Sequence, residues 1–404
     1  MHELGNSGQM IRDSERVARV TNALASEELD ALICTLPSNV LLLTGYWPVI
    51  GNAIAIITRD GAVGVVAPED EWDYARNSWA DCIHTFRPAS LERIRTAIEA
   101  ACGPLRDTAR ELHLGSGARI GFEGAGSFDP SSYASTFIYG AAVDTLLTAA
   151  LQEPTHVNAT GLLDRLRSVL TMREIACVRR ACTVAKQAFA SVASRLKPGM
   201  METSVAAMLR DALLGPGRCD GFAYCMSGSN AADAYAAYQR STDRRVQSDD
   251  FVLVHCNSHC GGFWTDITRT FVIHDMNERQ RDIYNAVLSA TNAAFSAVRP
   301  GVSASSVDRA ARDVMTDRGF AKEFKHATGH GVGFSAINHN ALPRIHPTSA
   351  EILEPGMIFN IEPAVYVDDE LGNRQCNMAL VTTDGAECLT PFLNDIGELC
   401  VRLS

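Results

Sequence analysis

Apolar positions in the first 150 residues switch between helical spacing and short continuous runs. Val17, Val20 and Leu24 recur at helical spacing behind a capping residue, Asp13, whereas residues 31–34 form an apolar run typical of a buried strand. The pattern predicts a hairpin turn at Asp60-Gly61. It also predicts helices over 17–24 and 92–101 and strands over 31–34, 53–58, 62–66 and 119–122. This alternation indicates an α/β layer.

Further along the chain the pattern changes to long amphipathic helices and longer strands. Periodicity lapses at Glu153-Pro154-Thr155, which predicts domains over 1–155 and 156–404. The predicted elements are helices over 174–196, 279–298 and 305–318 and strands over 251–255, 267–272 and 378–382. Helices flanking an antiparallel sheet predict an α+β class for this second domain.

Composition limits the classes of partner and the cellular compartment that we expect for this chain. A chain of 404 residues favours two domains, and a net charge of -11 without a basic block argues against nucleic acid or an anionic membrane as partner. No run of about 18 apolar residues predicts a membrane span. The charged start, Arg12 to Arg16, does not fit a signal peptide, so we expect the 12 cysteines to be reduced thiols in the cytoplasm.

Candidate chemistry begins in the first of three separated segments. His255 and Asp266 flank Gly261-Gly262, and a hairpin closing there is expected to set the two side chains opposite each other, with Cβ atoms about 5 Å apart. Cys256 then points to the other face. A zinc finger over 255–260 lacks a second cysteine pair. The plainer alternatives are a core histidine at 255 and an Asp266 that pairs with an arginine.

The other two segments add histidines and a second acid. His330 lies among three glycines that permit close backbone approach, with His326 four residues earlier. Glu362 follows an apolar run, and a buried glutamate needs a cation, an arginine or a raised pKa. The alternative for His326 is a surface histidine on a loop. The alternative for Glu362 is an ion pair with Arg374 and no bound metal.

Together, 254–271, 326–333 and 355–376 resemble the pita-bread metallopeptidase family, which includes aminopeptidase P, prolidase and creatinase. The resemblance spans about residues 16–390 and implies a creatinase/prolidase-type N-terminal domain before a pita-bread catalytic domain. Other roles that it implies are a substrate pocket at His326, structural support at Arg374 and, after an inferred two-residue insertion, a catalytic proton donor at His339. The family's five ligand positions fall on His255, Asp266, His330, Glu362 and Cys376.

This chain departs from the family at three positions. His255 and Cys376 stand where the resemblance implies carboxylates, and Tyr238 stands where the peptidases keep a histidine that contacts the scissile bond. Two divalent cations would be under-neutralised, so we predict one divalent metal held by nitrogen, oxygen and sulfur, which favours zinc or iron over manganese. The alternative is a metal-free, creatinase-like site in which Cys376 is a nucleophile or passive.

The predicted function is hydrolysis of a C–N bond, amide or amidine, in a small amino-acid-derived substrate. Water activated by the cation attacks the carbon, Glu362 or Asp266 accepts a proton, and His339 steadies the oxyanion. The alternatives are an Xaa-Pro aminopeptidase or dipeptidase and a non-catalytic binding protein on the same fold. The resemblance also implies a homodimer.

Overall fold

The computed structural model describes residues 11–49, 53–124, 140–215, 219–235 and 241–401. These residues form two compact units, and among them the boundary along the chain lies between Arg167 and Ser168. The sequence-based division after residue 155 stays a prediction. Within the described ranges, no helix is both long enough and apolar enough to cross a bilayer.

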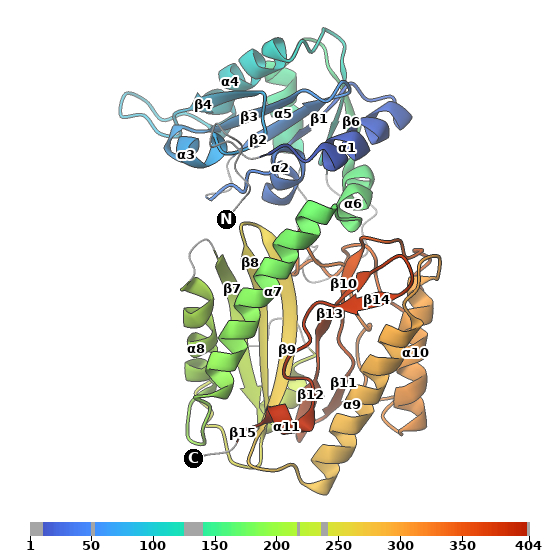
Figure 1. Ribbon diagram of the computed structural model, residues 1–404. Helices are drawn as coiled ribbons and strands as arrows, with labels where there is room; N and C mark the ends of the chain where they lie inside the picture. Colours follow the sequence, from blue (N-terminus) through green and yellow to red (C-terminus); the bar gives the residue numbers. More distant parts are fainter. Residues whose placement is uncertain (1–10, 50–52, 125–139, 216–218, 236–240, 402–404) are drawn as a thin grey trace. The chain divides into compact units, whose positions relative to one another are not determined.

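The first unit is a six-stranded mixed sheet between helices (Figure 1). Strand order is β4-β3-β2-β1-β5-β6, with β1 antiparallel to β2 and parallel to β5. Its elements are α1 (Ser14–Ser26), β1 (Ala31–Cys34), α2 (Pro37–Thr44), β2 (Ile54–Thr58), β3 (Val63–Pro68), a 3-10 turn (Glu69–Glu71), α3 (Trp72–Ala75), β4 (Cys82–Phe86), α4 (Ala97–Glu111), β5 (Arg119–Phe122), α5 (Ala141–Ala150), β6 (Thr155–Asn158) and α6 (Thr160–Ser168), which runs into the second unit.

Local sequence explains most of these elements. Helix α1 begins behind Asp13, whose side chain accepts a hydrogen bond from the backbone N–H of Arg16. All four residues of β1 are buried, as expected for a strand covered on both faces. The helix predicted to start at residue 92 starts instead at Ala97, because Thr96 and Glu99 form a capping box there.

The second unit packs helices around three sheets (Figure 1). The sheets have the orders β15-β9-β8-β7, β10-β13-β14 and β11-β12. Helices α7 and α8 pack on the β7-β8-β9 side, and α9 packs on β10 to β12. The elements are α7 (Met172–Ala193), α8 (Glu202–Leu214), β7 (Cys219–Ser227), a 3-10 turn (Gly228–Asp233), β8 (Phe251–Cys260), β9 (Phe263–Ile273), α9 (Glu278–Ala297), α10 (Ala304–Asp317), β10 (Ile358–Ile361), β11 (Ala364–Val367), β12 (Leu371–Arg374), β13 (Asn377–Val381), β14 (Ala386–Cys388), α11 (Ile396–Leu399) and β15 (Cys400–Val401).

The β8-β9 hairpin corrects one expectation about register. Gly261 and Gly262 both have positive φ, 60° and 85°, and form the two-residue turn. Counting back from this turn pairs Asn257 with Asp266 and His255 with Thr268. The prediction that His255 lies directly opposite Asp266 is therefore wrong by two residues. Both side chains still share one face of the hairpin, because strand side chains alternate with a period of two.

The cysteines correct a second expectation. Cys219 and Cys260 are directly opposite in the β7-β8 register and form a disulfide. Ten cysteines are free, and seven of these are buried. Cys256 packs in the apolar core on the other face of β8, as predicted. The zinc-finger alternative is excluded, since Cys260 is bonded to sulfur and Cys256 faces away from His255.

Candidate metal and substrate site

Three potential metal ligands from different strands meet in the second unit. Asp266 lies on β9, Glu362 follows β10, and Cys376 immediately precedes β13. One ligand atom from each lies within 4.8 Å of the other two, and all three residues are buried. The structure thus groups three of the residues predicted as ligands, although up to 110 positions separate them along the chain.

His330 presents a ligand-ready nitrogen to this group. Its Nδ1 lies 3.1 Å from the Gly331 carbonyl oxygen, to which only a protonated nitrogen can donate. The other ring nitrogen, Nε2, lies 3.5 Å from Asp266 Oδ2. Close packing explains the flanking glycines, because a Cβ at Gly329 would lie 1.9 Å from the Asn360 carbonyl oxygen. Burial lowers the pKa of His330, but the adjacent Asp266 carboxylate raises it more, so the net shift is upward. In the neutral ring the backbone contact places the proton on Nδ1, which leaves Nε2 as the nitrogen that could bind a metal.

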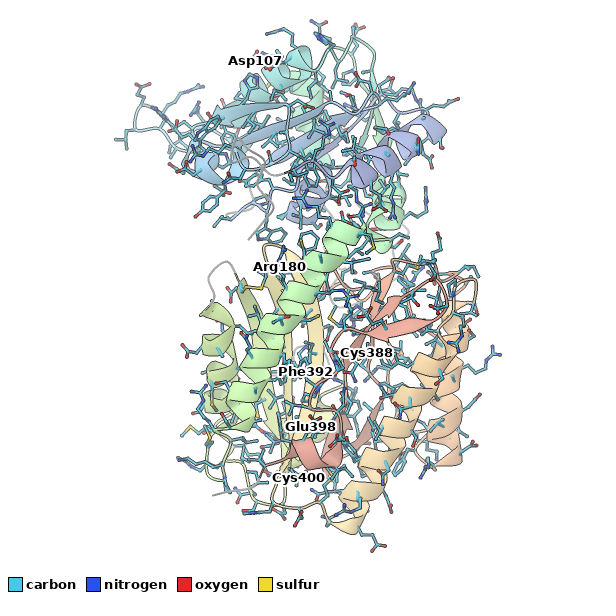
Figure 2. The ribbon with its side chains drawn as sticks, in the orientation of Figure 1. Asp107, Arg180, Cys388, Phe392, Glu398 and Cys400 are labelled. Atoms are coloured by element: carbon cyan, nitrogen blue, oxygen red, sulfur yellow. A yellow bond between two sulfur atoms is a disulfide. The ribbon has the colours of Figure 1, made fainter. Side chains whose placement is uncertain are left out.

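Cys376 is fixed by a buried arginine rather than by its own strand alone. Arg269 donates to the Cys376 and Phe392 carbonyl oxygens at 2.8 and 2.9 Å. Its guanidinium also stacks over the Phe392 ring, which Figure 2 labels, 4.7 Å from the centroid. This anchoring holds the Cys376 Sγ 3.4 Å from Asp266 Oδ1.

The Cys376 thiol has an environment that suits a ligand better than a nucleophile. Burial and the Asp266 charge raise the pKa of Cys376 well above its usual value. Its sulfur lies 3.2 Å from the Asp266 carbonyl oxygen and 3.4 Å from Asp266 Oδ1, and within the part of the chain that the structure describes no histidine lies within hydrogen-bond distance of it. Reactive thiolates need a nearby positive group that lowers the thiol pKa. Metal binding removes the thiol proton directly.

His255 lies beside Asp266, with its Nδ1 3.9 Å from Asp266 Oδ1, and three other residues contact its ring nitrogens. Its Nδ1 lies 2.9 Å from Thr268 Oγ1 and 3.2 Å from Arg374 Nη2, and its Nε2 lies 3.1 Å from Asn257 Oδ1. Burial, with a smaller contribution from the Arg374 charge, lowers the pKa of His255 to about 4, although the Asp266 charge acts in the opposite direction. His255 is thus neutral, and both of its nitrogens are engaged by the protein.

Arg374 holds this side of the site together. Its Nε donates to Thr268 Oγ1 at 3.0 Å, its Nη1 to Tyr366 Oη at 3.1 Å and its Nη2 to Tyr224 Oη at 2.6 Å. The Nε lies 3.8 Å from Glu362 Oε2, beyond hydrogen-bond distance. Arg374 therefore does not satisfy Glu362 as a close ion pair, which leaves the carboxylate available to a cation.

Two further predicted histidines border the same cavity. His326 and His339 line it together with Asp266, His330 and Glu362. His326 Nδ1 lies 2.7 Å from the Ala327 carbonyl oxygen, and its Nε2 lies 3.2 Å from Tyr366 Oη. Tyr238, the remaining predicted site residue, lies outside the described residues.

His339 stacks on the proposed ligand His330. Their ring centroids are 4.6 Å apart and the planes differ by 16°. Burial and the neighbouring His330 lower the pKa of His339 to about 3. At neutral pH its ring is therefore uncharged, and it can donate one hydrogen bond without carrying a positive charge.

Sequence reasoning missed Tyr224, Tyr366 and Asn257 as site residues. Tyr224 is the β7 partner of His255, and its ring stacks on the His255 ring at 4.7 Å. Asn257 lies two residues after His255 and so shares its face. The alternation of side chains between the two faces of β8 could have predicted that Asn257 belongs to the site.

The donor set fits one divalent cation. Tetrahedral zinc with bonds of about 2.0–2.3 Å holds its ligand atoms roughly 3.5 Å apart. Asp266 Oδ1 lies 3.4 Å from Cys376 Sγ, and Asp266 Oδ2 lies 3.5 Å from His330 Nε2, so each of these pairs has a separation close to that spacing. A second divalent cation would need further negative charge beside the first. At that place the structure has the neutral His255 and the positively charged Arg374 guanidinium, so a second cation fits poorly.

Glu362 is costly to keep ionised without metal, which gives a stability prediction. Burial and the Asp266 charge raise the pKa of Glu362. Because the folded-state pKa lies above the unfolded one, the stability that this group confers is present at low pH and is lost as pH rises through the folded pKa. We expect Glu362→Gln to raise the metal-free protein's unfolding free energy at pH 8 by about 1 kcal/mol or more, and to have little effect near pH 4.

Thermal and urea unfolding of chelator-treated protein measure this difference. The exposed Glu354→Gln serves as the matched control and leaves stability unchanged at both pH values. Added metal should stabilise the parent protein but not Glu362→Gln. Equal metal-free stability of the parent and Glu362→Gln at pH 8 would show that Glu362 is not a strained carboxylate.

Comparisons with known proteins agree with this fold. The sequence pattern of metallopeptidase family M24 matches residues 176–383, and that of the creatinase/prolidase N-terminal domain matches residues 16–169. A probable dipeptidase PepE of Mycobacterium bovis is 35% identical over 271 residues, which cover 64% of this chain and 71% of that protein.

Two solved structures share the fold across both units. Dipeptidase PepE from Mycobacterium ulcerans matches with a TM-score of 0.73 and 27% identity, covering 96% of this chain and 98% of that one. The prolidase from Pyrococcus horikoshii matches with a TM-score of 0.74 and 23% identity, covering 93% of this chain and 98% of that one.

Fold and site define a metal hydrolase with an appended creatinase/prolidase-type N-terminal domain. The chain belongs to metallopeptidase family M24. The predicted fold class is thereby confirmed, as is the prediction of a C–N bond hydrolase of the aminopeptidase P and prolidase type. Membership of this family implies use of a divalent metal.

Proposed function

We propose that this chain is a single-metal hydrolase that cleaves the C–N bond of a dipeptide-like substrate. The observation that supports this proposal most strongly is the set of potential metal ligands around Asp266. Asp266, Glu362 and Cys376 converge within 4.8 Å, and His330 Nε2 lies 3.5 Å from Asp266 Oδ2. The neutral His255 and the Arg374 cation stand beside this set, which supports one cation rather than two.

We assign Asp266, His330, Glu362 and Cys376 as the ligands, with His255 as a neighbour that does not bind metal. A divalent cation held there supplies Lewis-acid chemistry for attack of water on an amide carbon. Glu362 accepts the proton of the attacking water. His339 donates a hydrogen bond to the oxygen that gains charge.

The mixture of nitrogen, oxygen and sulfur donors supports zinc or iron over manganese. Convergence of His326 and His339 on one cavity with the ligand set supports catalysis over a binding protein that reuses the fold. The 35% identity to a probable dipeptidase supports a dipeptide-like substrate. A homodimer, which the family resemblance implies, and a cytoplasmic location remain proposals.

A panel of dipeptides tests the proposal. We expect zinc- or iron-loaded protein to hydrolyse non-proline dipeptides such as Ala-Leu, and to cleave Xaa-Pro dipeptides feebly even with manganese, since Tyr238 replaces a histidine. Release of free amino acids measures turnover. Rapid cleavage of several Xaa-Pro dipeptides would contradict the substrate preference. Undiminished turnover after complete chelation would favour the metal-free alternative.

A further inference from the structure

The hydrogen bonds beside the metal ligands run in one fixed direction, starting at Arg374. An arginine side chain can only donate. Its Nη2, 3.2 Å from His255 Nδ1, therefore requires that nitrogen to accept. Thr268 Oγ1, which accepts from Arg374 Nε, is free to donate its own proton to the same nitrogen at 2.9 Å. A neutral imidazole that accepts at Nδ1 carries its proton on Nε2.

This tautomer fixes the orientation of Asn257. His255 Nε2 lies 3.1 Å from Asn257 Oδ1, so the imidazole N–H donates and the amide oxygen accepts. Turning the amide over would bring an NH₂ group against an N–H, two donors face to face. The network therefore holds the Asn257 NH₂ group on the side away from His255.

Asn257 occupies a place where a substrate must come. It is directly opposite Asp266 in the hairpin register and is only 4% exposed. It lines the same cavity as Glu362 and His339. Its Nδ2 donates a hydrogen bond to no other described residue. Nδ2 is also not one of the fully buried side-chain nitrogen and oxygen atoms that lack a hydrogen-bond partner. Its NH₂ group therefore borders the open space of the cavity.

We infer that Asn257 donates a hydrogen bond to a carbonyl or carboxylate oxygen of the substrate and so helps to determine specificity. An NH₂ group held in this orientation cannot accept, which excludes a substrate ammonium as its partner. The inference rests on the proposed function, because it takes the cavity to receive a peptide-like substrate. His255 and Arg374 then act as positioning residues that hold the donor in place.

Two substitutions at Asn257 remove the donor in different ways. Asn257→Asp keeps the oxygen that faces His255 and puts an acceptor in place of the NH₂ group, whereas Asn257→Leu removes both polar atoms at similar volume. The matched control is Ser258→Ala. This neighbour points to the other face of β8, where its hydroxyl lies 2.7 Å from Thr265 Oγ1.

We expect both Asn257 variants to keep the parent's metal content and to lose about 10- to 100-fold in kcat/KM for Ala-Leu, while Ser258→Ala does not. A loss in kcat identifies the oxygen of the bond being cleaved, and a loss confined to KM identifies another substrate oxygen. Parent-like kinetics for Asn257→Asp, or a loss shared equally by Ser258→Ala, would overturn the inference.

A binding measurement separates this inference from the proposed function. If the parent hydrolyses no dipeptide, the proposed catalysis fails, but calorimetric titration with Ala-Leu still tests the contact. About 10-fold weaker binding by both Asn257 variants than by the parent and Ser258→Ala supports the hydrogen bond. Equal affinity in all four proteins, or no affinity in the parent, refutes it.

Discussion

Asp266→Asn is expected to empty the metal site and lower turnover by at least about 100-fold. Asp266 is the one residue that lies within 3.5 Å of both Cys376 and His330 in the donor set. Asparagine keeps the volume but removes the negative charge that a divalent cation requires beside a neutral histidine. Elemental analysis of the purified variant and its rate on Ala-Leu measure the two effects.

The matched control for this substitution is Asp275→Asn, an exposed aspartate just beyond β9. It makes the same chemical change in the same region and should keep both metal and activity. Retention of a full metal complement by Asp266→Asn would mean that the cation binds elsewhere in the protein.

Cys376→Asp separates a metal ligand from a nucleophile. If Cys376 binds metal, aspartate supplies an oxygen of similar reach, so metal is retained, preference moves toward manganese and part of the activity survives. Cys376→Ala, which offers no donor, should bind metal at least about 10-fold more weakly. If the thiol attacks the substrate, both variants should be inactive whatever metal they hold.

The structure supports the ligand result, because burial and Asp266 raise the pKa of the Cys376 thiol. Intact-protein mass spectrometry tests the opposing outcome, covalent catalysis by Cys376, most directly. A substrate adduct on Cys376 in metal-free, active enzyme would establish covalent catalysis and remove the cysteine from the ligand set.

The sequence predicted correctly those helices and strands that are defined by the residue pattern within the element itself. Residues 31–34 and 119–122 are strands as expected, because each is a short apolar or mixed run between turns. The start of α4 was missed, because the deciding hydrogen bonds join Thr96 to Glu99 rather than following the apolar pattern. The turn at Gly261-Gly262 was predicted correctly, but the register was missed by two residues. A two-residue turn at these glycines pairs Cys260 with Phe263 and therefore His255 with Thr268, not with Asp266.

The candidate site was predictable only through the family motifs. No local pattern relates Asp266 to Cys376, which meet because an isolated bridge joins Thr268 to Cys376. The roles of Tyr224 and Asn257 required strand pairing that spacing alone does not provide. Departures from the family pattern were visible in the sequence. Their consequence, a neutral His255 held between Arg374 and Asn257, was not.

The central claim is that the site holds one cation, and the metal content of protein purified without added metal tests it most directly. We predict about one zinc or iron per chain in the parent protein. His255→Asp combined with Cys376→Glu, which restores the carboxylates that the family resemblance implies, should raise the count toward two. Two metals per chain in the parent, both lost in Asp266→Asn, would contradict the account.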